Sequence, residues 1–207
     1  MSRKITLGLL AIILLCSGCN KGQKNKTATL PISESVINEA IEYGINNSEQ
    51  SNTEFVSDWT INLGYGQGKG NVTIITPFLT TALLSKQAHT QRQKLNRSLL
   101  EKLILEDADF IVFEFILFGD SPQFGKSAEF TLKYDNKEMK PAYKFTPSYA
   151  EMGRDYVQTL KGKVKFSKED IPDNTKVVLE ILFNVFESPI IQNKHLCKFE
   201  FDLSKYK

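Results

Sequence analysis

The hydrophobic pattern of the chain is strongest over residues 110–118 (FIVFEFILF), where every position except Glu114 is apolar or aromatic. Val, Ile and Phe favour a pleated backbone, and the run is too short to cross a bilayer as a helix. Alternate positions would place apolar side chains on both faces of a sheet. The pattern therefore predicts a buried central strand, with a second sheet covering one face and helices covering the other.

The chain before this strand predicts a helix followed by a hairpin. Residues 31–47 repeat apolar positions at helical spacing, and Ser33 or Ser35 can cap them. Residues 59–63 and 71–76 alternate as strands, with the glycine-rich GYGQGKG turning the chain between them. These glycines match neither the Walker A spacing nor the dinucleotide fingerprint, so we expect a flexible hairpin tip rather than a phosphate loop.

Two further helices are predicted between the hairpin and the central strand. Thr76 and Pro77 supply a cap and a first-turn proline for the first helix, whose later part is polar. Ser98 and Glu101 match the S-x-x-E capping box of the second helix, ahead of a leucine-rich stretch. We expect these leucines to pack on the face of the central sheet opposite the second sheet.

Strand patterns dominate the carboxyl-terminal half. They cover residues 127–134, 138–146, 156–166, 176–186 and 195–203. The last strand alternates clearly and points Cys197 inward, where we expect a small buried hydrophobe without a disulfide partner. The predicted fold class is α+β: an antiparallel β-sandwich preceded, and covered on one side, by amino-terminal helices.

Composition and charge are those of a globular protein, with 207 residues, 41% hydrophobic and 24% charged. The chain has 26 basic and 24 acidic residues, but Arg3 and Lys4 lie in a segment that we expect to be removed, which leaves 24 of each. A mature chain without excess positive charge has no global electrostatic reason to bind nucleic acid or anionic lipid. Nucleic acid is therefore not an expected partner.

Residues 1–18 have the pattern of a secretory signal. Two basic residues are followed by the apolar run ITLGLLAIILL and then by small residues. The CSGC segment that ends at Cys19 resembles the lipobox of bacterial lipoproteins, in which signal peptidase II cleaves before an acylated cysteine. Cys19 is the matching cysteine because Gly18 and Ser17 precede it, and Cys16 stands where the family usually has leucine.

This resemblance implies a lipid anchor on Cys19. Two or three acyl chains, at about 0.8 kcal/mol per buried methylene, are enough for stable membrane attachment. It also implies that Asn20 directs the protein to the periplasmic side of the outer membrane if the cell is Gram-negative. The predicted organisation is a signal peptide (1–18), a lipidated cysteine with a flexible tether (19–30) and one globular domain (31–207), with helices and hairpin in 31–106 and sandwich strands in 107–207.

Residues 116–121 (ILFGDS) resemble the nucleophile block of GDSL-type esterases, in which a serine follows a strand and a tight turn. The later blocks of that family are missing, because no Asp-x-x-His segment ends at His195 and His89 precedes Ser121 in the chain. A base oriented by a carboxylate cannot be assembled in that pattern. We expect Asp120 and Ser121 to cap backbone groups of a strand-ending turn.

The remaining titratable residues give weak site signals. Glu114 interrupts a buried strand, and we expect it to pair with a lysine or arginine or to reach solvent at an edge. We expect Lys161, Lys163, Lys165 and Lys168 on the solvated side of an outer strand, where lysine blocks edge-to-edge aggregation. Two distant histidines and one free cysteine lack metal-ligand spacing, so no metal or cofactor site is predicted.

The sequence therefore predicts a non-enzymatic, membrane-tethered module of the bacterial cell envelope, which binds an envelope protein or supports an assembly. The alternative is an envelope hydrolase whose residues converge in space near Ser121, with Asp120 and Glu114 as candidates. A cleft that brings His89 or His195 within hydrogen-bond reach of Ser121 would favour the hydrolase.

Overall fold

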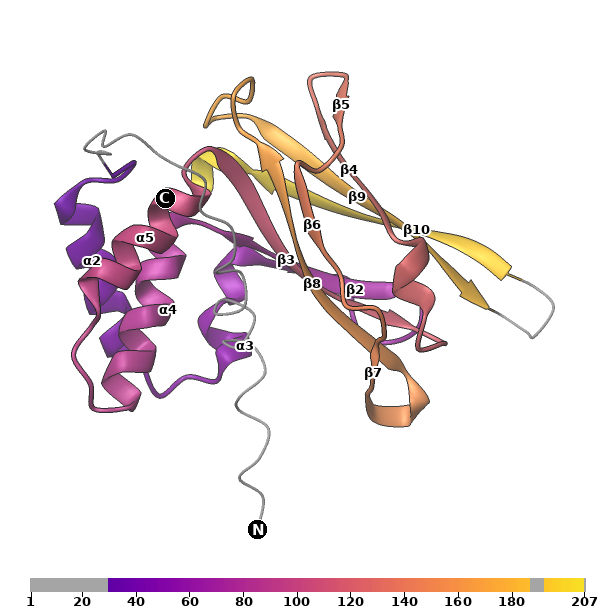
Figure 1. The fold of residues 1–207 in the computed structure, drawn as a ribbon, viewed down its shortest axis with the longest axis horizontal. Coiled ribbons are helices and arrows are strands. Elements are labelled where there is room, and N and C mark those ends of the chain that lie inside the picture. Colours follow the sequence, from indigo (N-terminus) through magenta and orange to yellow (C-terminus); the bar gives the residue numbers. More distant parts are fainter. Residues whose placement is uncertain (1–29, 187–191, 207) are drawn as a thin grey trace, which may run out of the picture.

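The computed structural model describes residues 30–186 and 192–206, so the predicted signal peptide and Cys19 lie outside the described part of the chain. The helices are α2 (Glu34–Asn46), α3 (Asn52–Phe55), α4 (Pro77–Thr90) and α5 (Arg97–Asp107), with 3-10 turns η1 (Ser57–Trp59), η2 (Phe124–Ser127), η3 (Arg154–Tyr156) and η4 (Leu203–Lys205). The strands are β1 (Thr60–Asn62), β2 (Lys69–Ile75), β3 (Phe110–Gly119), β4 (Glu129–Tyr134), β5 (Lys137–Met139), β6 (Tyr143–Phe145), β7 (Glu151–Met152), β8 (Gln158–Ser167), β9 (Lys176–Phe186) and β10 (Gln192–Asp202). The fold class is α+β, as predicted (Figure 1).

Helices α2 and α4 begin at the caps that the sequence predicts. The Ser33 hydroxyl accepts a hydrogen bond from the Val36 backbone N–H at 3.4 Å, and α2 follows directly. The Thr76 hydroxyl accepts one from the Leu79 N–H at 3.1 Å, with Pro77 in the first helical position. Each cap satisfies a backbone donor that the first turn of a helix would otherwise leave without a partner.

Helix α5 starts earlier than its predicted capping box. The Asn96 side chain accepts the Leu99 N–H at 3.0 Å, so the helix begins at Arg97 and Ser98 lies inside it. The predicted cap at Ser98 is wrong because Asn96 is an equally good capping residue two positions earlier.

The strands form two antiparallel sheets. In the first sheet the order is β1-β2-β3-β8-β6, and β7 also pairs with β8. In the second sheet the order is β10-β9-β4-β5. Strand β3 lies between β2 and β8, so the apolar run that dominates the sequence is a central strand, as predicted.

The single strand predicted over residues 138–146 is wrong. Strand β5 pairs with β4 in the second sheet, whereas β6 pairs with β8 in the first sheet. Pro141 stands between these two strands. Proline has no N–H to donate to a ladder, so the chain leaves one sheet there and joins the other.

A single buried cluster takes side chains from both sheets. Phe113, Phe115 and Leu117 of β3 are at most 1% exposed and belong to it together with residues of β4, β8, β9 and β10. The Phe113 ring lies 5.1 Å from the Phe201 ring, measured between centroids. Burying each such side chain contributes about 1.5–3 kcal/mol, which makes this cluster the main source of stability.

Cys197 is buried in the same cluster and is a free thiol, as predicted. Its Sγ donates a weak hydrogen bond to the Gly68 carbonyl at 3.3 Å. Burial raises the pKa of the Cys197 thiol to about 11, so the reactive thiolate is scarce at neutral pH.

The helices cover the first sheet only in part. Helices α2, α4 and α5 lie mainly beyond one end of the strands, and α3 lies near β2 (Figure 1). They pack on each other through clusters of their own: one includes Ala40, Leu79 and Ala82, and another includes Leu100 and Ile104. The leucines of α5 therefore build a helical layer. The prediction that they cover the outer face of the sheet is wrong.

Candidate functional site

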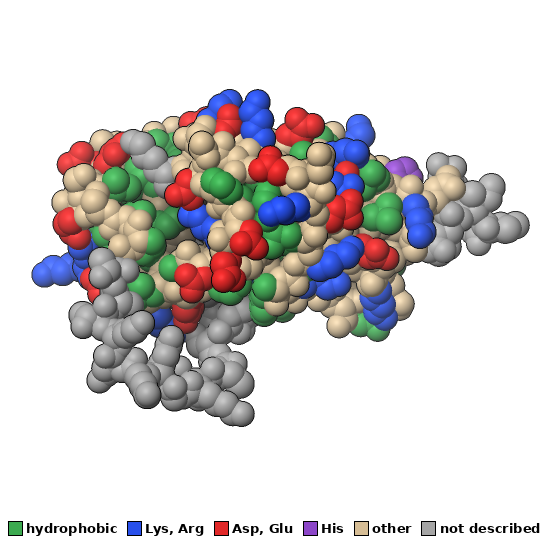
Figure 2. All heavy atoms as spheres, turned by 90° about the horizontal axis from the view of Figure 1, so that it is seen from above, with side chains coloured by type: hydrophobic (Ala, Val, Ile, Leu, Met, Phe, Trp, Pro, Cys, Tyr) green, Lys and Arg blue, Asp and Glu red, His purple; other side chains and the backbone are tan. Residues whose placement is uncertain are grey.

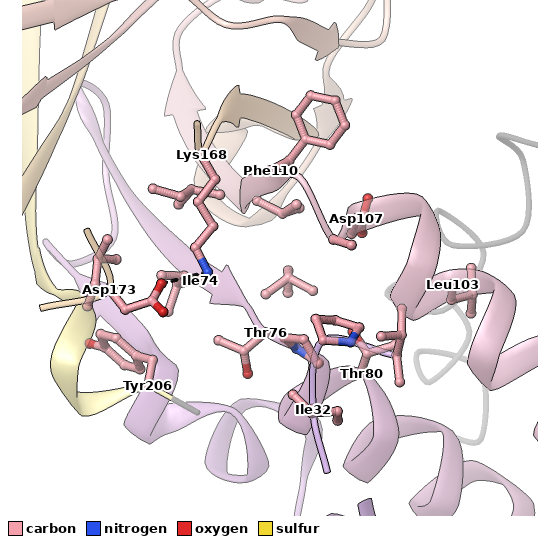
Figure 3. A pocket seen from close by; sticks show the side chains of 18 of the residues that line it. Ile32, Ile74, Thr76, Thr80, Leu103, Asp107, Phe110, Lys168, Asp173 and Tyr206 are labelled. Atoms are coloured by element: carbon pink, nitrogen blue, oxygen red, sulfur yellow. Dashed lines mark ion pairs between the residues drawn. The ribbon is translucent and has the colours of Figure 1, made fainter. Parts of the chain in front are cut away.

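A cleft of about 460 Å³ lies where the helices meet the end of the first sheet (Figure 3). Five parts of the chain line it: the segment leading into α2, the β2–α4 junction, the α5–β3 junction, the turn between β8 and β9, and the η4 segment near the carboxyl terminus. Its apolar lining includes Ile32, Ile74, Leu103, Ile104, Ile111 and Val112. The position follows from the topology, because β2 ends into α4 and β3 starts from α5 at the same end of the sheet.

The cleft also has polar lining residues, and one ion pair among them is exposed to solvent. Lys168 Nζ forms an ion pair with Asp173 Oδ1 at 2.7 Å, which is drawn as a dashed line in Figure 3. The Asp173 side chain is 82% exposed, so this pair lies in solvent and contributes little to stability. The hydroxyl-bearing residues Thr80 and Tyr206 also line the cleft.

Asp107, at the end of α5, lines the cleft and reaches across to β8. Its carboxylate pairs with Lys163 at 3.3 Å and with Lys165 at 2.5 Å. Lys163 and Lys165 are only 13% and 19% exposed, so this three-residue charge cluster is mostly shielded from water. It attaches the helical layer to the sheet and fixes one wall of the cleft.

The lysines of β8 therefore do not lie on an outer strand, and that prediction is wrong. Strand β8 pairs with β3 on one side and with β6 and β7 on the other. The sequence pattern missed Asp107 as the partner of Lys163 and Lys165 because the residues are more than fifty positions apart. Lys165 also lies over the Tyr143 ring, 5.5 Å from its centroid.

Glu114 lies on the outer face of the first sheet, between Thr73 of β2 and Lys163 of β8 in the strand register. Burial raises the pKa of the Glu114 carboxyl, and the nearby Lys163 opposes this shift. The sequence predicts that Glu114 pairs with a lysine or arginine or reaches solvent at an edge strand, and both predictions are wrong. Strand β3 is a central strand, and among the described residues Glu114 forms no ion pair, while Lys163 binds Asp107. Glu114 also lines a second, smaller pocket of about 100 Å³.

Ser121 follows β3 in a turn, as predicted, but the predicted cap by its side chain is wrong, because within the described residues the hydroxyl of Ser121 makes no hydrogen bond. Its carbonyl oxygen accepts the Phe124 N–H at 3.2 Å. His89 is exposed in the last turn of α4, and His195 on β10 lies against Gly68. Within the described ranges no hydrogen bond joins either histidine to Ser121, and Ser121 lines neither the cleft nor the smaller pocket.

The glycine-rich loop is a hairpin tip, as predicted. Strands β1 and β2 pair on either side of it, and Gly64, Gly66 and Gly68 have φ values of 98°, 123° and 75°. Such positive φ values are accessible to glycine at little cost. Gly68 also lies close to β10, where a Cβ would come within 2.5 Å of His195 Nδ1, so a larger residue there would have to displace that ring.

No family model matches the chain, and no curated protein matches its sequence. In the part of the chain that the structure describes, no helix is long and apolar enough to cross a membrane. Over the same residues, no group of three or more His, Cys, Asp or Glu side chains is placed to hold a metal ion.

Proposed function

We propose that this chain is a lipid-anchored module of the bacterial cell envelope that binds a ligand and catalyses no reaction. The anchor is supported by the basic residues, the apolar run and the small residues before Cys19. The polar tether over residues 19–30 would hold the domain near the membrane, on the periplasmic side of the outer membrane in a Gram-negative cell.

We propose a β-sandwich, with helices at one end, as the architecture of the domain. The shared buried cluster supports this, since rings from facing sheets meet in it, as Phe115 of β3 and Phe130 of β4 do at 4.8 Å. Face-to-face packing of two sheets produces such a core. The sheets would then act as the rigid scaffold, and the segments at their end would form the binding region.

The cleft of about 460 Å³ is the observation that carries the binding proposal. Small-molecule sites typically measure roughly 300–1,000 Å³ and combine an apolar lining with a few polar groups. The cleft has this composition, with isoleucines in its floor and the Lys168–Asp173 pair at its rim. The ligand that fits best is an amphipathic molecule whose apolar part enters the cleft and whose polar head meets the rim.

The distribution of charged side chains on the surface is compatible with an amphipathic ligand. Acidic and basic side chains are interspersed over the face seen in Figure 2. A mixed surface does not select a strongly charged macromolecule such as nucleic acid. An apolar contact confined to the cleft is therefore the better basis for recognition.

Photo-crosslinking tests the binding proposal. Palmitic acid that carries a diazirine would be added to the membrane-bound protein, irradiated, and the labelled peptides identified by mass spectrometry. We expect labels on peptides from the α5–β3 junction and from η4. Labels spread evenly over the domain would contradict the proposal.

A pair of variants makes this test specific. Ala108 lines the cleft and is half-buried, so Ala108→Leu should fill part of the cleft and reduce labelling at least tenfold. Ala142 is exposed before β6, and Ala142→Leu should leave the labelling unchanged. The alternative occupant of the cleft is an apolar side chain of an envelope protein. In that case the wild type would show no fatty acid labelling, and Ala108→Leu would lower the amount of that protein recovered from membranes with the tagged chain.

A further inference from the structure

The outer face of the first sheet carries two rows of side chains that cross four strands. The strand register aligns Thr60, Thr73, Glu114 and Lys163 in the first row. It aligns Asn62, Asn71, Ile116 and Lys161 in the second row. An antiparallel sheet commonly leaves one face open to water, and polar side chains are ordinary there. These two rows differ from such a face because part of them is enclosed in a pocket.

Helix α3 converts part of this face into a pocket of about 100 Å³. Asn52 and Val56 from α3 and its cap line the pocket above the two rows. Ile116 and the backbone at Gly162 complete the lining. This volume has room for several water-sized groups, so polar substituents of a ligand can enter it.

The hydrogen bonds of the first row fix the direction of its donors. The Thr60 hydroxyl donates to the Val56 carbonyl at 2.9 Å, and therefore the Thr73 hydroxyl donates to Thr60 Oγ1 at 2.7 Å. A hydroxyl has one proton, so Thr73 Oγ1 can offer only its lone pairs to a ligand. This oxygen lies beside Glu114 in the row.

Several groups of the pocket have no partner within the described residues. Glu114 and Lys161 form no ion pair or hydrogen bond there, and neither does the side-chain amide of Asn71. The Asn62 Oδ1 accepts the Gly64 N–H at 2.8 Å, which leaves the amide N–H groups of Asn62 available. A half-buried carboxyl that lines a cavity and lacks a partner is costly to the fold unless something binds it.

We propose that this pocket binds the hydroxyl groups of a neutral carbohydrate, with Glu114, Thr73 and Asn71 as the hydrogen-bonding residues. The pocket mixes acceptors and donors at close range, and a sugar hydroxyl is both an acceptor and a donor. A ligand with a full positive charge would be repelled by Lys161 and Lys163, and an anion would be repelled by Glu114 when it is ionised. Val56 and Ile116 provide apolar contacts for the C–H groups of the sugar ring.

This pocket is distinct from the cleft. The two cavities share no lining residue, and they favour ligands of opposite polarity. The carbohydrate proposal therefore does not depend on the proposed function, and each can fail without the other.

Calorimetric titration of the protein in the form that cells produce tests the proposal, in a detergent whose head group is not a sugar. The probes are neutral tetrasaccharides of glucose, mannose, galactose and N-acetylglucosamine. We expect saturable one-site binding of at least one of them. Glu114→Gln and Asn71→Ala should each weaken that binding at least tenfold, since each removes a hydrogen-bonding group at the ligand.

Two controls separate this site from other effects. Glu200 is exposed on β10, so Glu200→Gln repeats the same chemical change on the other sheet and should leave affinity unchanged. Ala108→Leu alters the cleft and should also leave sugar binding unchanged. Failure of every tetrasaccharide to bind with a Kd below about 10 mM would overturn the proposal, and so would wild-type affinity in a folded Glu114→Gln protein. Saturable binding of putrescine or citrate in place of the sugars would overturn it as well.

Discussion

The two faces of strand β3 differ in almost every physical respect. The inner face places Ile111, Phe113, Phe115 and Leu117 in a cluster shared with the second sheet, and all four are at most 5% exposed. The outer face places Phe110, Glu114 and Ile116 in half-buried positions along the cleft and the smaller pocket, and it also holds the buried Val112 and Phe118. The same strand therefore contributes to the buried core on one side and lines two cavities on the other.

This difference follows from what covers each face. Side chains of the second sheet join the inner-face residues in one buried cluster, so water is excluded there and only apolar side chains are tolerated. The helices contact the outer face at α3, at the end of α5 through Asp107, and at Ile75 of β2, which packs against the cluster that includes Leu79 of α4. Incomplete cover leaves cavities, and polar groups on that face can remain without protein partners.

The largest expected effect comes from truncating an inner-face ring. Phe115→Ala should lower the free energy of unfolding by about 3–5 kcal/mol, because it combines lost transfer energy with a cavity in a packed core. Phe110→Ala on the outer face is the matched control and should cost only about 1–2 kcal/mol, since its ring is half-buried. Urea denaturation measures both, and equal losses would show that the two faces are not different.

The next largest effect is expected at the junction between helices and sheet. Asp107→Ala removes the shared partner of Lys163 and Lys165 and should cost about 1–3 kcal/mol, because both lysines are mostly shielded from water. Asp173→Ala breaks the exposed pair with Lys168 and should cost no more than about 0.5 kcal/mol. The same denaturation experiment compares the two, and a similar cost for both would contradict the role given to Asp107.

The raised pKa of Glu114 should make the stability of the protein depend on pH. Burial raises the pKa of Glu114 in the folded protein, so the folded state holds this proton more tightly than the unfolded chain does. Stability associated with Glu114 is then present at low pH and is lost as the pH rises above the unfolded-state pKa of about 4.3. Thermal unfolding should show Glu114→Gln to be more stable than wild type at pH 7, with the difference shrinking toward pH 4. A constant difference across this range would contradict the assignment.

The sequence pattern predicted most of the strands and two of the helix caps, because these depend on local periodicity and on side chains a few residues from the backbone groups they bind. It placed Phe113, Phe115 and Leu117 in the core correctly for the same reason. It did not predict the break at Pro141 between the two sheets. A proline in a strand pattern indicates an interruption, but it does not indicate which sheet the chain joins next.

The hydrophobic pattern of the sequence did not predict either cavity. The cleft is lined by five segments from widely separated parts of the chain, and none of them carries a recognisable motif. The Asp107 cluster likewise joins residues that only the topology brings together. Glu114 was the one useful signal, since a carboxyl in an apolar strand indicates either a partner or a cavity, and the structure favours the cavity.

The smallest effect is expected at Ser121. Its backbone carbonyl forms the turn, and within the described residues its hydroxyl forms no hydrogen bond, so Ser121→Ala should change stability by less than about 0.5 kcal/mol. We expect the wild type to show no turnover on a generic ester panel. Turnover that disappears in Ser121→Ala, with unchanged thermal stability, would support the hydrolase alternative.

Mass spectrometry of the amino terminus tests the central claim, membrane attachment through Cys19, most directly. The protein would be extracted from membranes and digested, and its first peptide sequenced. We expect a peptide that begins at Cys19 and carries two or three acyl chains, and we expect Cys19→Ser to abolish both the acylation and the membrane fraction. A Cys19 with an unmodified thiol in the mature wild-type protein would contradict the account.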